Sequence, residues 1–255
     1  MKRYIVFIKQ VPASTRVSID PVTHALVRAG AKSRINPYDL HAVRAAVELR
    51  ERLGGEVVAV TMGPPQAEAA LREAMTAGAD RAVLLSDRAF AGSDTWGTGA
   101  VLAAAVRKIG DGDVLLFGKQ AVDGDTAQVG PGVAARLGLP QVTELLRFDE
   151  IRDGQLTVEK CCDNGTQQVR VSMPCVLTVT KEANEVSAPT LRQWERAQGL
   201  PLEVWGIGDL DLQPSDTGFA GSPTRVVATE AAATKGRAKI LGSAEELANL
   251  IRTLS

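Results

Sequence analysis

The stretch GKQAVDGDTAQVG, residues 118–130, carries side chains suited to binding a ligand but none of those that usually break bonds. Lys119 offers a positive charge, Asp123 and Asp125 offer hydrogen-bond acceptors, and the glycines let the backbone approach a ligand closely. The stretch contains no histidine and no cysteine. We therefore expect a binding loop and predict no catalytic residue, so that any reactive centre must belong to a bound cofactor.

Reactive side chains elsewhere in the sequence are few. His24 and His41 are the only histidines, and His41 lies in a helical pattern where a solvent-facing or partner-facing role is commoner than catalysis. The cysteines form no C-x-x-C pair, and adjacent Cys161 and Cys162 could pair only through a strained ring. We expect Cys161, Cys162 and Cys175 to be small apolar side chains in strands, and we predict no metal site.

The composition is that of a globular protein. Of 255 residues, 45% are hydrophobic and 23% are charged, and 29 basic against 30 acidic residues give a net charge of −1. No run of like charges and no basic stripe interleaved with aromatics is present, which argues against nucleic acid as a partner. The apolar run YIVFI near the amino terminus is too short for a signal sequence or a membrane span. We expect a cytoplasmic protein without direct membrane insertion.

Short apolar runs alternate with longer amphipathic segments up to about residue 140. The apolar runs are rich in Val, Ile and Leu without alternation, which is typical of parallel strands buried on both faces; they cover residues 4–8, 56–62, 81–86 and 113–118. The amphipathic segments predict helices over 37–55, 65–79 and 94–110, with Asn36 and Asp94 as helix starts. This order predicts an α/β fold with a doubly wound, mostly parallel sheet.

The pattern changes after residue 140. Segments 144–151, 152–161 and 167–180 read as strands joined by the turn signals DG and NG, so we expect antiparallel additions to the sheet. From residue 183 to 242 the chain is rich in Pro, Gly, Thr and Ala with little periodicity, which favours an extended carboxyl-terminal arm. The last segment, SAEELANLIRTLS, predicts an amphipathic helix with Ser243 as N-cap and Glu246 three residues later.

Glycines and hydroxyl side chains follow the predicted parallel strands, at the edge where ligands bind in open α/β sheets. Free N–H groups at the helix starts there favour a phosphate or pyrophosphate. We expect Asp125 to cap a helix beginning near Thr126, Asp123 to accept from ribose hydroxyls, and Lys119 to face the phosphates. The predicted cofactor-binding residues are Ile8, Asn36, Met62, Gly63, Thr95, Thr98, Gly118, Lys119, Gln120, Asp123, Gly124, Asp125, Thr126, Ala127, Gln128 and Val129.

Standard phosphate-binding motifs are missing. The sequence has no G-x-x-x-x-G-K-[ST], and GTGAVL at 97–102 does not complete G-x-G-x-x-G. The residues alone thus predict a nucleotide clamp of nonstandard type. They divide the chain into a nucleotide-binding α/β domain (1–182), a partner-binding arm (183–242) and a carboxyl-terminal helix (243–255).

A series of motifs resembles the beta subunits of electron-transfer flavoproteins over residues 1–195. They are IKQVP, INPYDLHAV, VTMGPP, AMTAGADRAVLL, LLFGKQAVDGDTAQVGPGVAARLGLPQVT and PTL, in the family's order and spacing. The resemblance implies a heterodimer with a larger alpha subunit that carries an FAD, and an adenine nucleotide bound by this chain.

The resemblance implies FAD as that nucleotide, with structural AMP as the alternative. The segments DTWGT at 94–98 and GDTAQVGP at 124–131 look like the electron-bifurcating branch, whereas members that bind AMP tend to lack the Asp-Thr-x-x-Thr segment. In the bifurcating branch NADH reduces the FAD bound by the beta subunit, one electron passes to ferredoxin or flavodoxin, and the other passes to the alpha-subunit FAD. In the alternative, all redox chemistry takes place on the alpha subunit.

The resemblance also implies a partner dehydrogenase, an acyl-CoA dehydrogenase or another flavin dehydrogenase. Leu191 matches the anchor of the family's recognition loop, but the usual basic stretch is replaced by RQWERAQGLPLEVW, and Ala13 stands where relatives often have an acidic residue. We expect Trp205 to be buried against the alpha subunit and Trp194 to stay accessible. A regulatory domain of the universal-stress type would share the sheet but would leave the arm and the loop motif unexplained.

Overall fold

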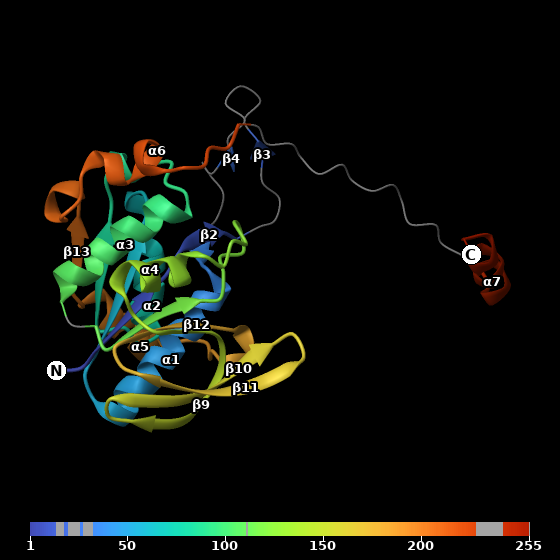
Figure 1. Ribbon diagram of the computed structural model, residues 1–255, viewed down its shortest axis with the longest axis horizontal. Helices are drawn as coiled ribbons and strands as arrows, with labels where there is room; N and C mark the ends of the chain where they lie inside the picture. The colour runs from blue at the N-terminus through green and yellow to red at the C-terminus, as the bar shows by residue number, and fades with distance from the viewer. Residues whose placement is uncertain (14–17, 20–25, 28–32, 111, 228–241, 255) are drawn as a thin grey trace. The chain divides into compact units, whose positions relative to one another are not determined.

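The computed structural model of the chain describes residues 1–13, 18–19, 26–27, 33–110, 112–227 and 242–254. The described residues fall into two units, which we treat separately. The larger unit comprises residues 1–17 and 28–226, and the smaller comprises residues 18–27 and 227–255. Figure 1 shows the chain coloured from its amino to its carboxyl terminus.

A mixed sheet, nine-stranded within the described part of the chain, forms the centre of the larger unit. Its spatial order is β11-β10-β9-β12-β8-β1-β6-β7-β13. The strands are β1 (Arg3–Phe7), β6 (Glu56–Met62), β7 (Arg81–Leu85), β8 (Val114–Gly118), β9 (Gln141–Arg152), β10 (Gln155–Cys162), β11 (Gly165–Ser172), β12 (Cys175–Val179) and β13 (Leu202–Trp205). All neighbours from β9 through β12, β8, β1, β6 and β7 to β13 are parallel. The predicted doubly wound, mostly parallel sheet is confirmed.

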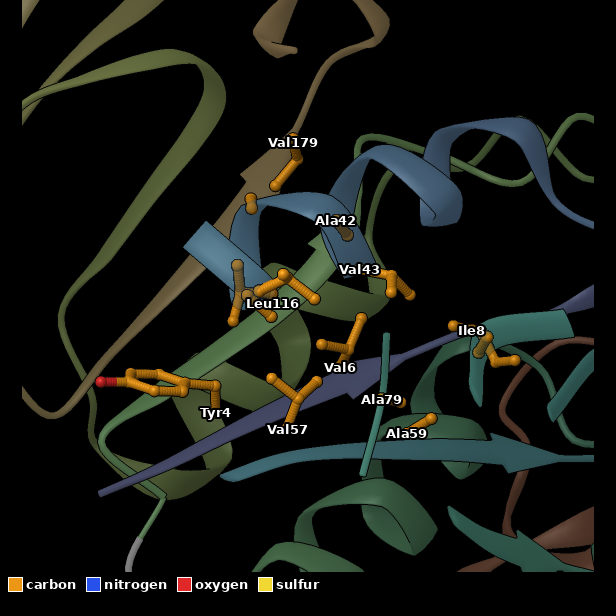
Figure 2. Close-up of a cluster of buried hydrophobic side chains, with 14 of the residues drawn as sticks. Tyr4, Val6, Ile8, Ala42, Val43, Val57, Ala59, Ala79, Leu116 and Val179 are labelled. Carbon is orange, nitrogen blue, oxygen red and sulfur yellow. The ribbon is translucent and has the colours of Figure 1, made fainter. Parts of the chain in front are cut away.

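Helices pack on both faces of this sheet, and the alternation of side chains along the strands explains why. Tyr4, Val6 and Ile8 point into a core shared with α1 and α2, part of which Figure 2 shows. Ile5 and Phe7 point into the opposite core, shared with α3 and α4. The helices are α1 (Pro37–Leu53), α2 (Glu68–Thr76), α3 (Thr95–Ile109), α4 (Val129–Leu137), α5 (Leu191–Gln198) and α6 (Gly218–Gly221). Strands buried on both faces carry continuous apolar runs, as the sequence shows.

Asn36 and Asp94 occupy the N-cap positions of α1 and α3, as predicted. The Asp94 carboxylate accepts hydrogen bonds from the backbone N–H groups of Trp96 and Gly97 at 2.9 and 3.0 Å. Asn36 instead makes no side-chain cap, and Pro37 begins its helix. The Asn36 side chain is therefore left to bond outside its own helix.

The predicted antiparallel additions are β10 and β11, which extend β9 into a three-stranded ribbon. β9 first runs parallel to β12 with an irregular register, in which Val142 opposite Leu177 is followed by Leu145 opposite Val179. This is a β-bulge, since one strand places an extra residue between two pairs. Glu144 lies within it, with a left-handed φ of 60°.

The segment after residue 183 is not a structureless arm as far as residue 226. It supplies α5, which packs against α2, and β13, which pairs in parallel with β7 at the edge of the sheet. Arg72 reaches the carbonyl oxygens of Ala197 and Leu200, and Arg196 pairs with Asp80 at 2.8 Å. The expected boundaries at 182 and 242 stay predictions, but β13 is a sheet element that the sequence pattern did not predict.

Two short sheets hold the remaining strands of the described residues. β2 (Gln10–Pro12) pairs antiparallel with β5 (Ser33–Ile35). In the smaller unit β3 (Ser18–Ile19) pairs antiparallel with β4 (Leu26–Val27), and α7 (Ala244–Leu254) forms the carboxyl-terminal helix. The backbone N–H of Glu246 donates to the Ser243 hydroxyl at 3.2 Å, which confirms Ser243 as the cap of α7. Residues 228–241 of the predicted arm and His24 lie outside the described residues.

Candidate functional site

The strand order places a topological switch point between β1 and β8. From β1 the chain proceeds to β6 on one side of it, while β8 lies on the other, with Phe7 opposite Phe117 in the register. In open α/β sheets ligands bind beyond the carboxyl ends of the strands at such a point. We call the segments that follow the two strands, residues 8–12 and 118–128, the switch-point loops. They contain the IKQVP motif and most of the GKQAVDGDTAQVG motif.

Asn36 lies beneath the switch-point loops and is 0% exposed. Its side-chain nitrogen donates to the carbonyl oxygen of Gln120 and to Oδ1 of Asp39, both at 2.9 Å. Its side-chain oxygen accepts from the backbone N–H of Val122 at 3.2 Å. Its backbone N–H donates to the Lys9 carbonyl at 2.8 Å. Asn36 therefore touches both switch-point loops from below and does not lie on their outer surface.

Asp39, in the first turn of α1, adds a second link to the same two loops. It is 5% exposed, and its Oδ2 accepts from the backbone N–H of Lys9 at 2.7 Å. It also accepts from the backbone N–H of Gly118. A Cβ on residue 118 would lie 2.3 Å from Oδ1 of Asp39, so only glycine fits where β8 meets α1. This glycine lets α1 approach closely, and its contact with a ligand stays a prediction.

Burial raises the pKa of Asp39 from 3.8 to about 7. Hydrogen bonds from Asn36 and from the backbone of Lys9 and Gly118 oppose that effect, as does the Lys9 charge, but they do not cancel it. A buried carboxyl at the switch point thus titrates near neutral pH. Sequence reasoning did not single out Asp39, because one acidic residue in a helical first turn is common.

The loop from Lys119 to Gln128 has an unusual backbone. Asp125 and Ala127 have φ angles of 48° and 53°, although neither is glycine, whereas Gln128 is right-handed with φ −102° and ψ −17°. A left-handed residue followed by a right-handed one, as in Ala127 and Gln128, turns successive N–H groups toward a common centre, which is an arrangement that binds anions. Non-glycine residues with positive φ occur mainly where function requires them.

The helix after this loop begins at Val129, with Gln128 as its N-cap and no side-chain cap bond. The expectation that Asp125 caps a helix near Thr126 is therefore wrong. The left-handed residues delay the helix, and the Asp125 carboxylate accepts instead from Nε2 of Gln120 at 2.8 Å. Without a capping side chain, the first N–H groups of α4 remain suited to a phosphate.

Both lysines of the switch-point loops are paired with carboxylates. Lys9 Nζ lies 2.7 Å from Oδ1 of Asp123, and Lys119 Nζ lies 3.1 Å from Oε2 of Glu144. The hydrogen bond that Lys119 donates to Glu144 holds the pKa of Lys119 above its usual value. Asp123, expected to meet a ribose, and Lys119, expected to meet phosphates, are thus both engaged within the protein. The groups that remain suited to an anion at this site are mainly backbone N–H groups.

The start of α3 and the end of the loop after β8 meet at a shallow hollow of about 470 Å³. Thr95 and Gln128 both line it, together with Trp96 and Arg136, whose guanidinium lies 4.0 Å from the centre of the Trp96 ring. Thr98 follows one turn later in α3, its N–H bonded to the Asp94 carbonyl. The structure thus brings the start of α3 and the start of α4 together.

The loop after β6 joins the site through Gln66, whose carbonyl accepts from the Gln10 side-chain nitrogen at 2.9 Å. Met62 ends β6, and the Gly63 N–H donates to the Leu85 carbonyl. Ile8 is buried in the core, so its side chain supports the site from within. Lys9 and Glu144 also lie at this site, although the sequence did not single them out as site residues. Lys9 could have been found from the IKQVP motif, whereas Glu144 reaches the site through a β-bulge that no motif marks.

Two of the predicted partner-binding side chains are open to solvent. On α5, Leu191 is 71% exposed and Trp194 is 53% exposed. Trp205 is only 8% exposed and packs in the core beneath β13, with Lys108 over its ring at 4.6 Å. The expectation that Trp205 is buried against a partner is corrected, because its own domain already covers it.

Other kinds of site find no support among the described residues. There, no group of three His, Cys, Asp or Glu side chains is arranged to hold a metal ion. Within the same ranges, no helix has the length and hydropathy needed to cross a bilayer. His41 contacts Asn184 at 3.0 Å.

Comparison with known proteins agrees with this geometry. The electron transfer flavoprotein domain matches residues 23–205. A "Protein FixA" of Azorhizobium caulinodans is 45% identical over 241 residues, covering 91% of this chain and 86% of that protein. The "Electron transfer flavoprotein subunit beta" of Thermoanaerobacterium thermosaccharolyticum is 43% identical over 254 residues, covering 98% and 97%.

A third relative is the "Caffeyl-CoA reductase-Etf complex subunit CarD" of Acetobacterium woodii, 41% identical over 240 residues, with 94% of this chain and 91% of that protein covered. The matches span almost the full length of each protein. The chain therefore belongs to the electron transfer flavoprotein family, as a beta subunit of the kind that pairs with an alpha subunit to transfer electrons.

Proposed function

We propose that this beta subunit binds FAD at the switch-point loops and works with its alpha subunit in electron bifurcation from NADH. The observation that carries the proposal is the backbone of residues 125–128, where left-handed Asp125 and Ala127 precede the uncapped start of α4. Such a backbone supports a phosphate or pyrophosphate. The relative CarD, named as a subunit of a caffeyl-CoA reductase complex, supports the larger assembly by analogy.

The charges around the site favour a nucleotide with little net phosphate charge. Lys9 and Lys119 are each offset by a carboxylate, and Asp125 adds another. Backbone N–H groups can bind the diester oxygens of a pyrophosphate or a single phosphate, whereas a triphosphate would face uncompensated repulsion. The residues present therefore fit FAD or AMP better than ATP.

Bound FAD would supply the redox chemistry, accepting a hydride from NADH and passing electrons on singly. The chain itself binds and orients the nucleotide through the loops after β1, β6 and β8 and the start of α3. No side chain of these loops needs to act as acid or base, because hydride transfer depends on distance and orientation. The carboxylate pairs of Lys9 and Lys119 keep the loops in place.

The proposed partners are the alpha subunit, a flavin dehydrogenase such as an acyl-CoA dehydrogenase, and ferredoxin or flavodoxin as low-potential acceptor. The exposed apolar side chains of Leu191 and Trp194 support a protein contact at α5. The site residues predicted from the sequence remain proposals as direct nucleotide contacts, with Asn36 and Ile8 acting from beneath.

The test is to denature the purified heterodimer and count the nucleotides released. Two FAD per heterodimer supports the proposal, whereas one FAD and one AMP would assign this chain the structural nucleotide. A matched pair of variants tests the loop. Ala127→Gly keeps the left-handed backbone and should retain the nucleotide, while Ala127→Val, which disfavours φ of 53°, should release it at least tenfold faster. Equal retention in both variants would place the phosphates elsewhere.

A further inference from the structure

Asn36 is engaged with both switch-point loops at every polar atom of its side chain. The nitrogen donates to Gln120 and Asp39, and the oxygen accepts from Val122. Its backbone N–H is bonded to Lys9, in the other loop. Both N–H groups of the amide are thus used, and the side chain is 0% exposed, so it has no surface with which to contact a ligand.

The hydrogen bonds of Asn36 connect the two loops that form the site. The loop after β1 and the loop after β8 belong to neighbouring strands on the two sides of the switch point. Asn36 and Asp39, at the start of α1, lie between the two loops and bond to the backbone of each. The spacing between the two sets of backbone N–H groups is thus set from below by two buried side chains.

We propose that Asn36 is a positioning residue: it never touches the nucleotide, but it fixes the loop of Gln120 and Val122 at the distance from Lys9 at which the loop amides can bind phosphate. The proposal rests on the proposed nucleotide-binding function. It goes further because it assigns the spacing of the phosphate-binding amides to a buried side chain rather than to a side chain that faces the ligand.

The residue type follows from the donors and acceptors it meets. The Gln120 carbonyl and the Asp39 carboxylate need a donor, whereas the Val122 N–H needs an acceptor. Only a side-chain amide offers both at this length. Aspartate would keep the bond from Val122 but would place a carboxylate against the Gln120 carbonyl, which loses its donor.

A simpler role is that Asn36 and Asp39 stabilise only the start of α1. The exchanged pair, Asn36→Asp with Asp39→Asn, separates the two roles. The amide nitrogen introduced at position 39 can donate to the carboxylate introduced at position 36, and the amide oxygen can accept from the Lys9 N–H, so the pair and its net charge are retained. The bond to the Gln120 carbonyl is lost in the exchange. If Asn36 only stabilises α1, nucleotide retention should recover in the double variant. If Asn36 positions the loop, nucleotide retention should not recover.

The experiment measures nucleotide release from purified heterodimers of the parent, Asn36→Asp, the exchanged pair and a control, Tyr4→Phe. Tyr4 is buried in the same core and loses one hydrogen bond, to the Gly54 carbonyl at 3.1 Å, far from both loops. Release of FAD and AMP is followed by filtration and chromatography well below each variant's Tm. We expect release at least tenfold faster in both Asn36 variants and within twofold of the parent in Tyr4→Phe.

Hydrogen exchange of the amides in residues 119–123 gives a readout that needs no nucleotide. Faster exchange there in both Asn36 variants, with β10 and β11 unchanged, supports the positioning role even if the parent carries no nucleotide, an outcome that would refute the proposed function alone. Parent-like release and exchange in the exchanged pair would overturn the inference. So would parent-like exchange in Asn36→Asp.

Discussion

Asp39 is buried among hydrogen-bond donors, yet burial dominates and raises its pKa from 3.8 to about 7. Between these values the unfolded chain is ionised at this position and the folded chain keeps the proton. The unfolded state then binds fewer protons, so the contribution of Asp39 to stability falls as pH rises from about 4 to about 7 and is constant above that.

We predict that the stability difference between the parent and Asp39→Asn changes with pH across this window. At about 1.4 kcal/mol for each unit of pKa difference, the gap corresponds to on the order of 4 kcal/mol. Urea unfolding at intervals between pH 4 and 8 measures it, with exposed Glu51→Gln as the matched carboxyl-to-amide control. A constant difference between parent and Asp39→Asn would show that Asp39 is not titrating in this range.

Glu144 has a backbone conformation that costs folding free energy. Its φ of 60° lies in the region that β-branched residues avoid most strongly. We predict that Glu144→Val lowers the free energy of unfolding by about 1–2 kcal/mol, whereas Glu144→Asn, which tolerates this backbone, stays within about 1 kcal/mol of the parent. The neighbouring Thr143→Val is the control. Equal losses for Val and Asn at 144 would mean that the Lys119 ion pair, and not the backbone, decides the effect.

These two residues show what the sequence could not reveal about the site. The glycines and polar residues of 118–130 marked a binding loop, because their types are suited to one wherever they occur. Asp39 and Glu144 acquire their properties only from tertiary packing: the first from burial against Lys9 and Gly118, the second from a bulge that turns its carboxylate toward Lys119. Neither the burial of a single carboxylate nor a bulge leaves a local pattern in the sequence.

At the level of elements, the sequence predicted the parallel strands well because each is a continuous apolar run between glycine-ended helices. It failed for β13. The four residues LEVW have mixed burial, since this edge strand has only one neighbour and an exposed face. It also placed the start of α4 near Thr126, because a capping aspartate looks the same in sequence whether its own backbone is right- or left-handed.

The role of β13 can be tested through its tryptophan. Trp205 is buried in the core with its indole N–H bonded to Glu203 at 3.1 Å. We predict that Trp205→Ala lowers the free energy of unfolding of the free subunit by about 3–5 kcal/mol, as expected for a large buried aromatic. Trp194→Ala, on the exposed face of α5, should change it by no more than about 0.5 kcal/mol. Chemical denaturation of both variants measures the contrast, and a reversed order would restore the view that Trp205 belongs to a partner interface.

At the scale of the whole molecule, the chain matches its relatives over almost their entire length. The larger unit has two apolar cores that account for the sheet and for α1 to α4. The smaller unit is different in kind. Its α7 has only 11 residues, and isolated helices of that length are marginal in water. An amphipathic helix of this size requires an apolar surface to pack on.

Because beta subunits of this family pair with an alpha subunit, we predict that α7 gains protection from hydrogen exchange in the heterodimer. Leu247 and Leu250 share one face of α7 at three-residue spacing, and Leu247 is exposed. Leu247→Glu should weaken heterodimer formation at least tenfold, since it places a charge on that face. Asn249→Glu adds the same charge on the opposite face and should leave the affinity within twofold. Affinities come from titration of the two separately purified subunits. If both variants bind like the parent and α7 exchanges equally fast in the free and paired subunit, then α7 does not contribute to the heterodimer interface.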